Sequence, residues 1–478
     1  MINDILNNFK KISQIPRCSG NESAICQWLS DWAKNNDFAV KTDEMQNILI
    51  KIPATAGYEN APIVVLQGHL DMVCEQTPDA HHDFTKDPIQ LIYEGDWLKA
   101  NKTTLGADNG IAIAIAMTLA QQKKDVPHPP LELLFTVDEE TGLHGAAALE
   151  PGFFQGRCLI NIDSEQEGYL TVGCAGGFNT DITIPIVWKQ VPTDYQLIKI
   201  NAGGMSGGHS GIDINAEKAN AIKILAQTLH SIKQQIDIRL VHINGGTAHN
   251  AIPRDSETKI FVPPKDVNKL KQIALAAEKT LKAEYKNTEP NLFIKVDASD
   301  ETFSQSMENS NQVIDLLLAL PHGIAAMSTD IKGLVETSNN LATVSIEAGQ
   351  LKILSSQRSS VESKLEALTE RVEAVARLAG GKANSGNRYP AWQPNMASSL
   401  LAKSRHIYEK LFDTKPVVDI LHAGLECGII GKKVPGMDMI SIGPTIKYAH
   451  SPDEKIHVAS IGKVWEFLLA LLKEVKHQ

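Results

Sequence analysis

The apolar run Ile63-Val64-Val65-Leu66 is followed closely by His69-Leu70-Asp71, and this sequence of residues most constrains the fold. A short continuous apolar run is typical of a buried strand. Residues two apart on a strand point to the same face, so His69 and Asp71 are expected to face one site. We interpret the imidazole of His69 as a metal ligand and the carboxylate of Asp71 as the group that orients it.

The same pattern recurs along the first third of the chain. Strands are predicted at residues 47–52, 62–67, 131–137 and 158–162, and helices at 21–33 and 111–121. The pair Glu139-Glu140 and then Asp163 follow two of these strands. Alternating strands and helices predict an α/β sheet covered by helices on both faces, with functional groups gathered where the strands end.

A chain of 478 residues is too long for a single hydrophobic core, so two domains are expected. Candidate ligands stop at Asp163 and resume only at His450. We therefore predict an α/β catalytic domain built from residues 1–183 and 384–478, with an inserted α+β lid domain at 184–383. Alternating strands at 181–186 and 197–200, helices at 216–234 and 267–286, and a strand at 236–241 are expected in the second region. Residues 384–392 are predicted to form the returning linker.

Composition limits the possible partners and the compartment. The 46 basic and 56 acidic residues give a net charge of −10, which disfavours nucleic acid or an anionic membrane as a partner. The six cysteines are scattered and are predicted to be reduced thiols rather than a disulfide framework. The amino terminus has no signal-peptide pattern, and the longest apolar stretch, residues 111–120, is too short to span a bilayer. We expect a cytoplasmic protein.

The candidate ligands can be arranged as a dinuclear metal site. Two divalent cations about 3.5–4 Å apart need a carboxylate between them. Asp108 is suited to this position because it lies in a tight turn, Gly106-Ala107-Asp108-Asn109-Gly110, that precedes a helix. One cation is then expected to bind His69 and Asp163, and the other Glu140 and His450. A His-x-Asp triplet alone is more often incidental; the repetition of strands that end in imidazole or carboxylate supports the metal site.

Glu139 and Glu140 are adjacent and are not expected to share one role. One of them would bind metal, and its neighbour would act as the general base for a bridging water. The glycine-rich stretch 203–211 lacks the Gly-Lys-Ser/Thr of a phosphate-binding loop. It also lacks the second glycine of a serine-hydrolase elbow, because Ile212 stands in that place.

Several motifs resemble those of the aminoacyl-histidine dipeptidases, a branch of the dinuclear-zinc peptidases that include carnosinase, carboxypeptidase G and peptidase T. The resemblance runs nearly from end to end. The motifs that carry it lie at residues 67–73, 82–89, 103–110, 136–140, 161–165, 207–211, 250–254, 422–427, 441–445 and 450–454.

The resemblance implies the same ligands: His69 and Asp163 for one zinc ion, Glu140 and His450 for the other, and Asp108 between them. It also implies that Glu139 is the base and that Asp71 orients His69. In the inserted domain it implies three further roles. His209 would stabilise the oxyanion, Asn250 would contact the substrate, and Arg358 would bind the terminal carboxylate of the substrate.

We therefore predict zinc-dependent hydrolysis of dipeptides with free termini, including Xaa-His dipeptides such as carnosine, by a metal-bridged hydroxide with Glu139 as base. The cofactors are two Zn²⁺ per chain, with Co²⁺ or Mn²⁺ as substitutes, and a homodimer is implied by the resemblance. An N-acyl-amino-acid deacylase or a tripeptidase on the same scaffold is the nearest alternative. A metal-binding protein without catalysis is a more distant one, because such a protein has no need of Glu139.

Overall fold

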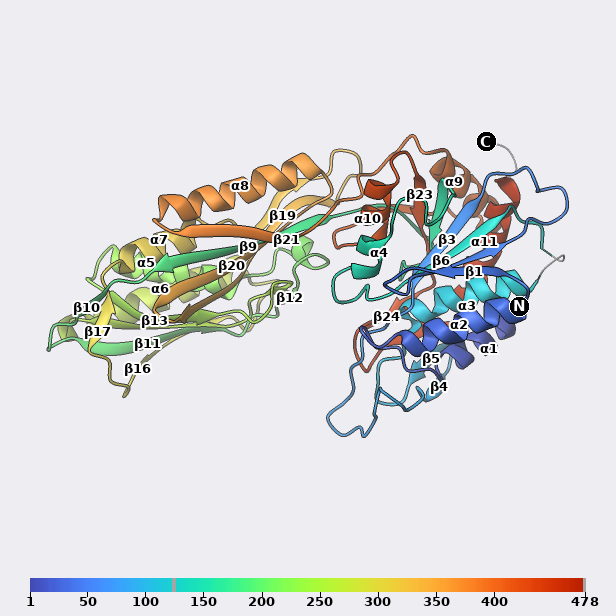
Figure 1. Ribbon diagram of the computed structural model, residues 1–478. Helices are drawn as coiled ribbons and strands as arrows, with labels where there is room; N and C mark the ends of the chain where they lie inside the picture. The colour runs from blue at the N-terminus through green and yellow to red at the C-terminus, as the bar shows by residue number, and fades with distance from the viewer. Residues whose placement is uncertain (123–125, 476–478) are drawn as a thin grey trace. The chain divides into compact units, whose positions relative to one another are not determined.

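The computed structural model describes residues 1–122 and 126–475, and they form two compact units (Figure 1). The first unit consists of Met1–Cys174, Trp392–Ile420 and Leu425–Gln478. The second consists of Ala175–Ala391 and the short segment Leu421–Gly424. The chain therefore leaves the first unit twice, once for a whole domain and once for four residues.

The first unit is built on an eight-stranded sheet in the order β1-β2-β6-β3-β7-β23-β8-β22. Its strands are β1 (Ala39–Thr42), β2 (Ile48–Ile52), β3 (Val64–His69), β6 (Leu131–Thr136), β7 (Cys158–Asn161), β8 (Tyr169–Cys174), β22 (Val417–Leu421) and β23 (Asp438–Ser441). Strands β6, β3, β7 and β23 are parallel neighbours. A smaller sheet joins β24 (Ile446–Lys447), β25 (Lys455–His457), β5 (Trp97–Ala100) and β4 (Leu91–Glu94).

Seven helices are described in the first unit: α1 (Ile2–Ile12), α2 (Ser23–Asn35), α3 (Ala107–Gln121), α4 (His144–Ala148), α9 (Ser399–Phe412), α10 (Glu426–Lys433) and α11 (Val458–Glu474). From β3 the chain passes through α3 to β6, the neighbour of β3 on one side in the sheet. It then passes through α4 to β7, the neighbour of β3 on the other side. Right-handed crossovers in opposite directions place α3 and α4 on opposite faces of the sheet. This arrangement confirms the predicted α/β class with helices on both faces.

Helix α3 shows why the core lies where it does. Its residues from Ile111 to Ala120 are buried on every side, because α3 lies between β3 and α1. A helix that is apolar all round is typical of such a fully covered position. Among residues 1–122 and 126–475, no helix is both long enough and apolar enough to cross a membrane.

The second unit contains an antiparallel sheet in the order β16-β11-β15-β13-β19-β20-β9-β21, with β18 paired to β19. Its strands are β9 (Gly176–Pro185), β11 (Gln196–Gly203), β13 (Arg239–Gly245), β15 (Ser256–Val262), β16 (Phe293–Ala298), β18 (Gly323–Met327), β19 (Val335–Glu347), β20 (Gln350–Ser359) and β21 (Lys382–Tyr389). Two-stranded pairs are formed by β10 (Trp188–Gln190) with β17 (Gln305–Met307), and by β12 (Gly208–His209) with β14 (Ala251–Ile252).

Helices α5 (Ala221–Lys233), α6 (Val267–Glu284), α7 (Ser310–Ala319) and α8 (Glu362–Leu378) pack with this sheet around one core. Alternate residues of strand β11 face different hydrophobic clusters, which explains why both sets are apolar. Ile198 and Ile200 of β11 enter the main core, whereas Leu197 joins a separate cluster with Val241 and Phe261. This alternation is the one expected for antiparallel strands with two differently covered faces.

Two sequence predictions in the second unit need correction. Residues 384–389 are not a linker: they belong to β21, in which Ala383 pairs with Ile182 of β9. This is an edge strand, where a polar, glycine-containing sequence is tolerated. The helix predicted from residue 216 begins only at Ala221, since the side chain of Asn220 accepts hydrogen bonds from the amides of Ile222 and Lys223 and caps it.

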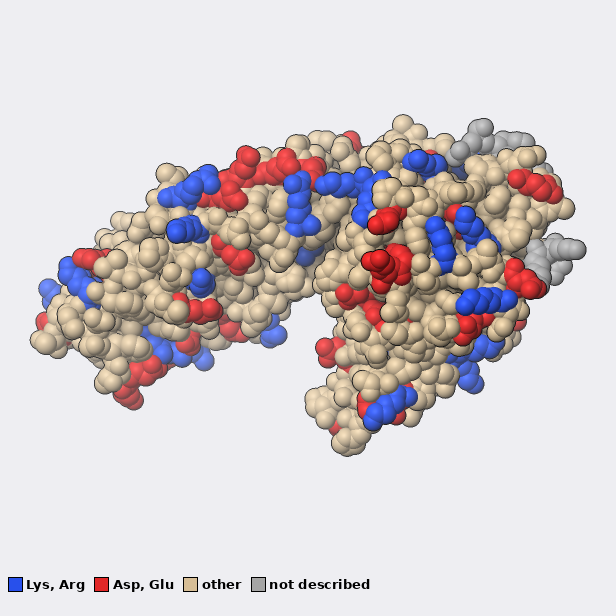
Figure 2. All heavy atoms as spheres, in the orientation of Figure 1, with Lys and Arg blue, Asp and Glu red and all other residues tan. Residues whose placement is uncertain are grey.

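The observed unit boundaries also differ in position from 183 and 384. Both of these positions lie inside strands of the second sheet, β9 and β21. The chain passes from one unit to the other after Cys174 and again after Ala391. On the face shown in Figure 2, acidic and basic side chains are interspersed over each unit. Arg388 of β21 illustrates the pairing, because its guanidinium donates to Glu362 and Glu366 of α8.

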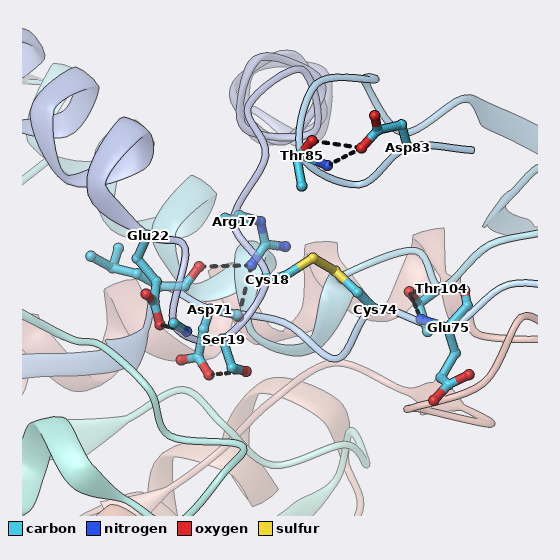
Figure 3. Close-up of a disulfide and its surroundings, with 12 residues drawn as sticks. Arg17, Cys18, Ser19, Glu22, Asp71, Cys74, Glu75, Asp83, Thr85 and Thr104 are labelled. Carbon is cyan, nitrogen blue, oxygen red and sulfur yellow. Dashed lines mark hydrogen bonds between the residues drawn. A yellow bond between two sulfur atoms is a disulfide. The ribbon is translucent and has the colours of Figure 1, made fainter.

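The prediction that all six cysteines are reduced is wrong for one pair. Cys18 and Cys74 form a disulfide across a sequence separation of 56 residues (Figure 3). A parallel backbone bridge between Cys18 and Met72 brings the two segments together, with the Cα atoms of the cysteines 5.7 Å apart. Scattered positions in the sequence hide this proximity. The remaining four, Cys26, Cys158, Cys174 and Cys427, are buried thiols.

Candidate metal centre and substrate-binding residues

The topology of the first unit brings the predicted ligands to one edge of the sheet. His69 is the last residue of β3, Glu139 and Glu140 follow β6, and Asp163 follows β7. These three strands are parallel, so their carboxyl ends meet at the same edge. The strand order also reverses at β3, and such a switch point opens a crevice where α/β proteins bind ligands.

Asp108 lies at the centre of the site and faces two imidazoles. Its Oδ1 is 3.0 Å from Nε2 of His69, and its Oδ2 is 3.1 Å from Nε2 of His450. His69 Nε2 is also 3.4 Å from Asp163 Oδ1, and His450 Nε2 is 3.0 Å from Glu140 Oε2. The ligand atoms therefore form two groups that share Asp108. The structure brings together all five predicted ligands in the predicted combination.

The charges of this site fit a pair of divalent cations. Burial and neighbouring carboxylates raise the pKa of Asp163 to about 6 and raise the pKa of Glu140. Hydrogen bonds to Asp108 and Glu140 raise the pKa of His450 to about 11. Oε1 of Glu140 is buried and has no hydrogen-bond partner among the described residues. Such a site needs positive charge, and imidazole nitrogens with carboxylate oxygens are the donors that zinc and similar ions prefer.

Glu139 is placed beside the ligands. One of its oxygens lies within 4.8 Å of ligand atoms of His69 and Glu140. Burial, together with the charges of Asp163 and Glu140, raises its pKa well above the ordinary value for a glutamic acid. A carboxylate with a raised pKa is a stronger base than an exposed one, as a general base requires.

Asp71 is fully buried, and its carboxylate contacts four groups of the site and its surroundings. Its Oδ1 lies 3.2 Å from Nδ1 of His69 and accepts the amide of Glu139 at 3.1 Å. Its Oδ2 accepts the amide of Glu140 at 3.2 Å and the hydroxyl of Ser19 at 2.8 Å. One carboxylate thereby orients an imidazole and both acidic residues that follow β6.

The sequence reasoning missed two charged residues that hold the ligand-bearing segments. Arg17 is buried, and its guanidinium donates to the carbonyls of Leu70, Asp71 and Gly106. Glu454 is buried and accepts backbone amides of the turn that contains Asp108. Glu454 lies within the motif at 450–454, and its separation of four residues from His450 is the signal that the sequence offers for it.

His209 and Asn250 lie side by side in the second unit. His209 of β12 pairs with Ala251 of β14, and the amide of Ser210 donates to the carbonyl of Asn250 at 2.7 Å. Nδ1 of His209 accepts the amides of Gly211 at 3.2 Å and Ile212 at 3.1 Å. In a neutral imidazole the proton is then on Nε2, which makes Nε2 a hydrogen-bond donor.

Arg358 is also in the second unit and is buried on β20. Its Nη1 donates to the hydroxyl of Tyr389 at 2.9 Å, whereas its Nε has no hydrogen-bond partner among the described residues. Burial and the nearby Arg358 lower the pKa of His422 to about 3, so this neighbour is neutral. A buried guanidinium with an unused donor is suited to bind a carboxylate.

Comparisons with known proteins identify the family of this chain. Over 468 residues, the chain is 41% identical to the cytosol non-specific dipeptidase of Escherichia coli (strain K12), covering 98% of this chain and 96% of that protein. The crystal structure of an aminoacylhistidine dipeptidase from Vibrio alginolyticus is similar, with a TM-score of 0.89 and 38% identity over 98% of this chain and 96% of that one.

A more distant likeness concerns the fold alone. The aminopeptidase PepT of Bacillus cereus has a TM-score of 0.58 and 16% identity over 100% of this chain and 99% of that one. The sequence profile described as peptidase family M20/M25/M40 matches residues 65–474, most of the chain. This chain is therefore a member of peptidase family M20/M25/M40.

Proposed function

We propose that this protein is a metal-dependent dipeptidase that hydrolyses dipeptides with free termini, including Xaa-His dipeptides such as carnosine. One observation carries the proposal: the two oxygens of Asp108 face His69 and His450, with Glu139 beside them. The end-to-end similarity to a non-specific dipeptidase and to an aminoacylhistidine dipeptidase supports the choice of substrate.

In this proposal His69 and Asp163 would hold one divalent cation and Glu140 and His450 would hold the other, with Asp108 serving both groups of ligands. We propose zinc, with Co²⁺ or Mn²⁺ as substitutes, because two imidazoles and three carboxylates are a nitrogen and oxygen donor set. When bound, the cations lower the pKa of a water molecule and polarise the carbonyl group of the substrate.

Glu139 is the proton carrier of the proposed reaction. It takes a proton from the attacking water as the new carbon–oxygen bond forms. It then gives this proton to the nitrogen of the leaving amine as the carbon–nitrogen bond breaks. The raised pKa of Glu139 suits both steps. Asp71 fixes Glu139 by accepting its amide, and so holds the base relative to His69.

The residues of the second unit are proposed to bind the substrate. The Nε2–H group of His209 would donate to the oxygen that becomes negatively charged, since Nδ1 is already an acceptor for two amides. Arg358 would bind the terminal carboxylate through the donor that has no partner among the described residues. Asn250, which directly precedes β14 and whose carbonyl accepts the amide of Ser210, would contact the peptide.

Turnover of β-alanyl-histidine and of several α-dipeptides tests the proposal, with the purified protein stripped of metal and then supplied with zinc. Activity is expected only with metal. Glu139→Gln should retain metal and lose about 10²–10⁴-fold in turnover. Glu150→Gln, an exposed glutamate on the same unit, is the matched control. Metal-bound protein that cleaves none of these dipeptides would exclude the dipeptidase.

The same assay separates the closest alternatives. An N-acyl-amino-acid deacylase would prefer N-acetyl amino acids, and a tripeptidase would prefer substrates that are one residue longer. We also propose a cytoplasmic location, supported by the description of the Escherichia coli relative as a cytosol enzyme. A homodimer is proposed from the family resemblance, and light scattering of the purified protein tests it.

A further inference from the structure

Glu454 accepts four consecutive backbone amides. Its Oε2 accepts the amides of Leu105 at 2.7 Å and Gly106 at 2.9 Å, and its Oε1 accepts those of Ala107 at 2.8 Å and Asp108 at 3.3 Å. Both oxygens act only as acceptors, which an ionised carboxylate can do. The side chain is 2% exposed, so water does not replace these bonds.

These bonds join two segments of the proposed metal centre. Glu454 and Asp108 are 346 residues apart in sequence, but Glu454 is only four residues from His450. The amides belong to the turn that precedes the regular part of α3, because Asp108 and Asn109 have non-helical backbone angles. These buried N–H groups therefore need an acceptor from elsewhere in the chain. On the other side of this turn, Arg17 donates to the carbonyl of Gly106.

We propose that Glu454 is a positioning residue that sets the location of Asp108 relative to His450 before metal binds. It contacts no proposed ligand atom of either residue; it acts through the backbone of the Asp108 turn and through the short chain to His450. The inference rests on the proposed metal centre. Its consequence is tight binding of the cation held by Asp108, Glu140 and His450.

Metal titration of the stripped protein against a coloured chelator tests this role without relying on activity. Glu454→Gln places an amide where the backbone donors need an acceptor, so it should weaken binding of one of the two cations about 10–100-fold. Glu454→Asp keeps the charge and should show a smaller loss. Asp453→Asn changes the exposed neighbouring carboxylate and should bind both cations as the unchanged protein does.

Unfolding temperatures of the metal-free variants separate positioning from stability. A lower unfolding temperature with unchanged metal affinity, in either Glu454 variant, would overturn the inference. Glu454→Asp provides the test if Glu454→Gln does not fold. If the unchanged protein itself binds no metal, the proposed function fails instead, so the two failures are distinguishable.

A second inference rests on a different observation, the Cys18–Cys74 disulfide (Figure 3). Cys18 lies between Arg17 and Ser19, which bond to the main chain and the side chain of Asp71. Cys74 is three residues beyond Asp71. The disulfide thus cross-links the segment that supports Asp71 to the segment that contains it.

Redox chemistry among the described cysteines is concentrated at this pair. Cys18 and Cys74 are only partly buried. Burial raises the pKa of Cys26 and Cys158 to about 12 and that of Cys174 to about 11. It also raises the pKa of Cys427 well above its usual range. Thiols with such raised pKa values react slowly, because the thiolate is the reactive form.

We infer that the Cys18–Cys74 bond is a reversible redox switch that controls how firmly the segment of Arg17 and Ser19 holds Asp71. A cellular dithiol would reduce it by thiol–disulfide exchange: two electrons and two protons pass to the protein, which gains two thiols, and the donor becomes a disulfide. Reduction would loosen the segment of Arg17 and Ser19 and weaken metal binding. This fits the proposed cytoplasmic location, where persistent disulfides are rare and regulatory ones occur.

The test compares metal affinity in the two redox states. The Cys18→Ser/Cys74→Ser variant, and the unchanged protein reduced by a phosphine, should both bind zinc about fivefold more weakly than the oxidised protein. Reoxidation should restore the zinc affinity of the unchanged protein and leave that of the double serine variant as it was. Cys26→Ala is the matched control and should behave as the oxidised protein does.

Alkylation followed by mass spectrometry, after equilibration in glutathione buffers, measures whether the bond is reducible in the folded protein. Reduction within the range of cellular glutathione buffers is expected. If the bond resists these buffers, or if zinc affinity is equal in both redox states, the disulfide is a purely stabilising cross-link. Either outcome would overturn the proposed redox switch.

Discussion

Oδ1 of Asp71 lies 3.2 Å from Nδ1 of His69, the last residue of β3 and two residues earlier in the sequence. This contact fixes the ring so that Nε2 is directed at Asp108. Orienting carboxylates of metal-binding histidines typically change metal affinity or activity about 10–100-fold when removed. We therefore expect Asp71→Asn to lower kcat/KM by this amount, measured with zinc-loaded protein. Asp96→Asn, an exposed change on the same unit, should have no effect; equal activities in the two variants would contradict the orienting role.

Proton binding by His450 should make the metal-free protein sensitive to pH. Contacts with Asp108 and Glu140 raise its pKa in the folded state to about 11 from an ordinary value of 6.5. Because the folded pKa is the higher one, the contribution to stability is complete below pH 6.5 and is lost as the pH rises towards 11. The stability advantage of the unchanged metal-free protein over His450→Ala should therefore decrease between pH 6 and pH 9 in thermal unfolding. A constant or growing advantage would contradict this.

The same protonation predicts the pH dependence of metal binding. A cation must displace the proton from His450, so affinity should increase as the pH rises above 6.5. Zinc competition titrations at several pH values measure this increase. Affinity that falls with rising pH, in the absence of metal hydroxide precipitation, would be contrary to the proposed ligand role of His450.

Arg17 should matter for stability more than its position near the amino terminus implies. Its guanidinium is 2% exposed and satisfies carbonyls of Leu70, Asp71 and Gly106. Arg17→Gln leaves buried acceptors without donors, and we expect a loss of about 2–4 kcal/mol in the free energy of unfolding. Denaturant unfolding measures it. Arg157→Gln, on an exposed arginine that donates to Pro435, is the control and should cost far less.

Arg358 should determine the need for a free carboxyl terminus in the substrate. A lysine cannot reproduce the planar, two-pronged contact of a guanidinium with a carboxylate. Arg358→Lys should raise KM for dipeptides about 10–100-fold, the equivalent of a charged hydrogen bond. Dipeptide amides should be poor substrates for the unchanged protein and for Arg358→Lys. The substitution should change KM much less for these amides than for dipeptides. Arg388→Lys, at a more exposed arginine paired with α8, is the control; an equal increase in KM for dipeptides and their amides would exclude carboxylate binding.

Much of the first unit follows from local pattern. The strand predicted at 131–137 is β6 (Leu131–Thr136), and that at 158–162 is β7 (Cys158–Asn161). Both are short, mostly apolar runs, for which the pattern of burial is the dominant signal. Because His69 and Asp163 follow such runs, the sequence pattern predicts that they converge at one edge of the sheet.

Other features depend on contacts between residues far apart in sequence. The edge strand β21 has a linker-like composition and becomes a strand only because β9 pairs with it. The segment Leu421–Gly424 lies in the second unit although its neighbours on both sides lie in the first. Neither has a local signal, since composition reports burial and turn preference but not the partner.

The sequence by itself determined which residues can chelate metal and on which strands they lie, because apolar periodicity and residue chemistry are local properties. The tertiary structure decided how these residues are held. Glu454 reaches the amides of the Asp108 turn across 346 residues, and Cys18 reaches Cys74 across 56. Such contacts arise when chain segments pack together, and the free energy that selects them comes from burying the whole core rather than from any short stretch of sequence.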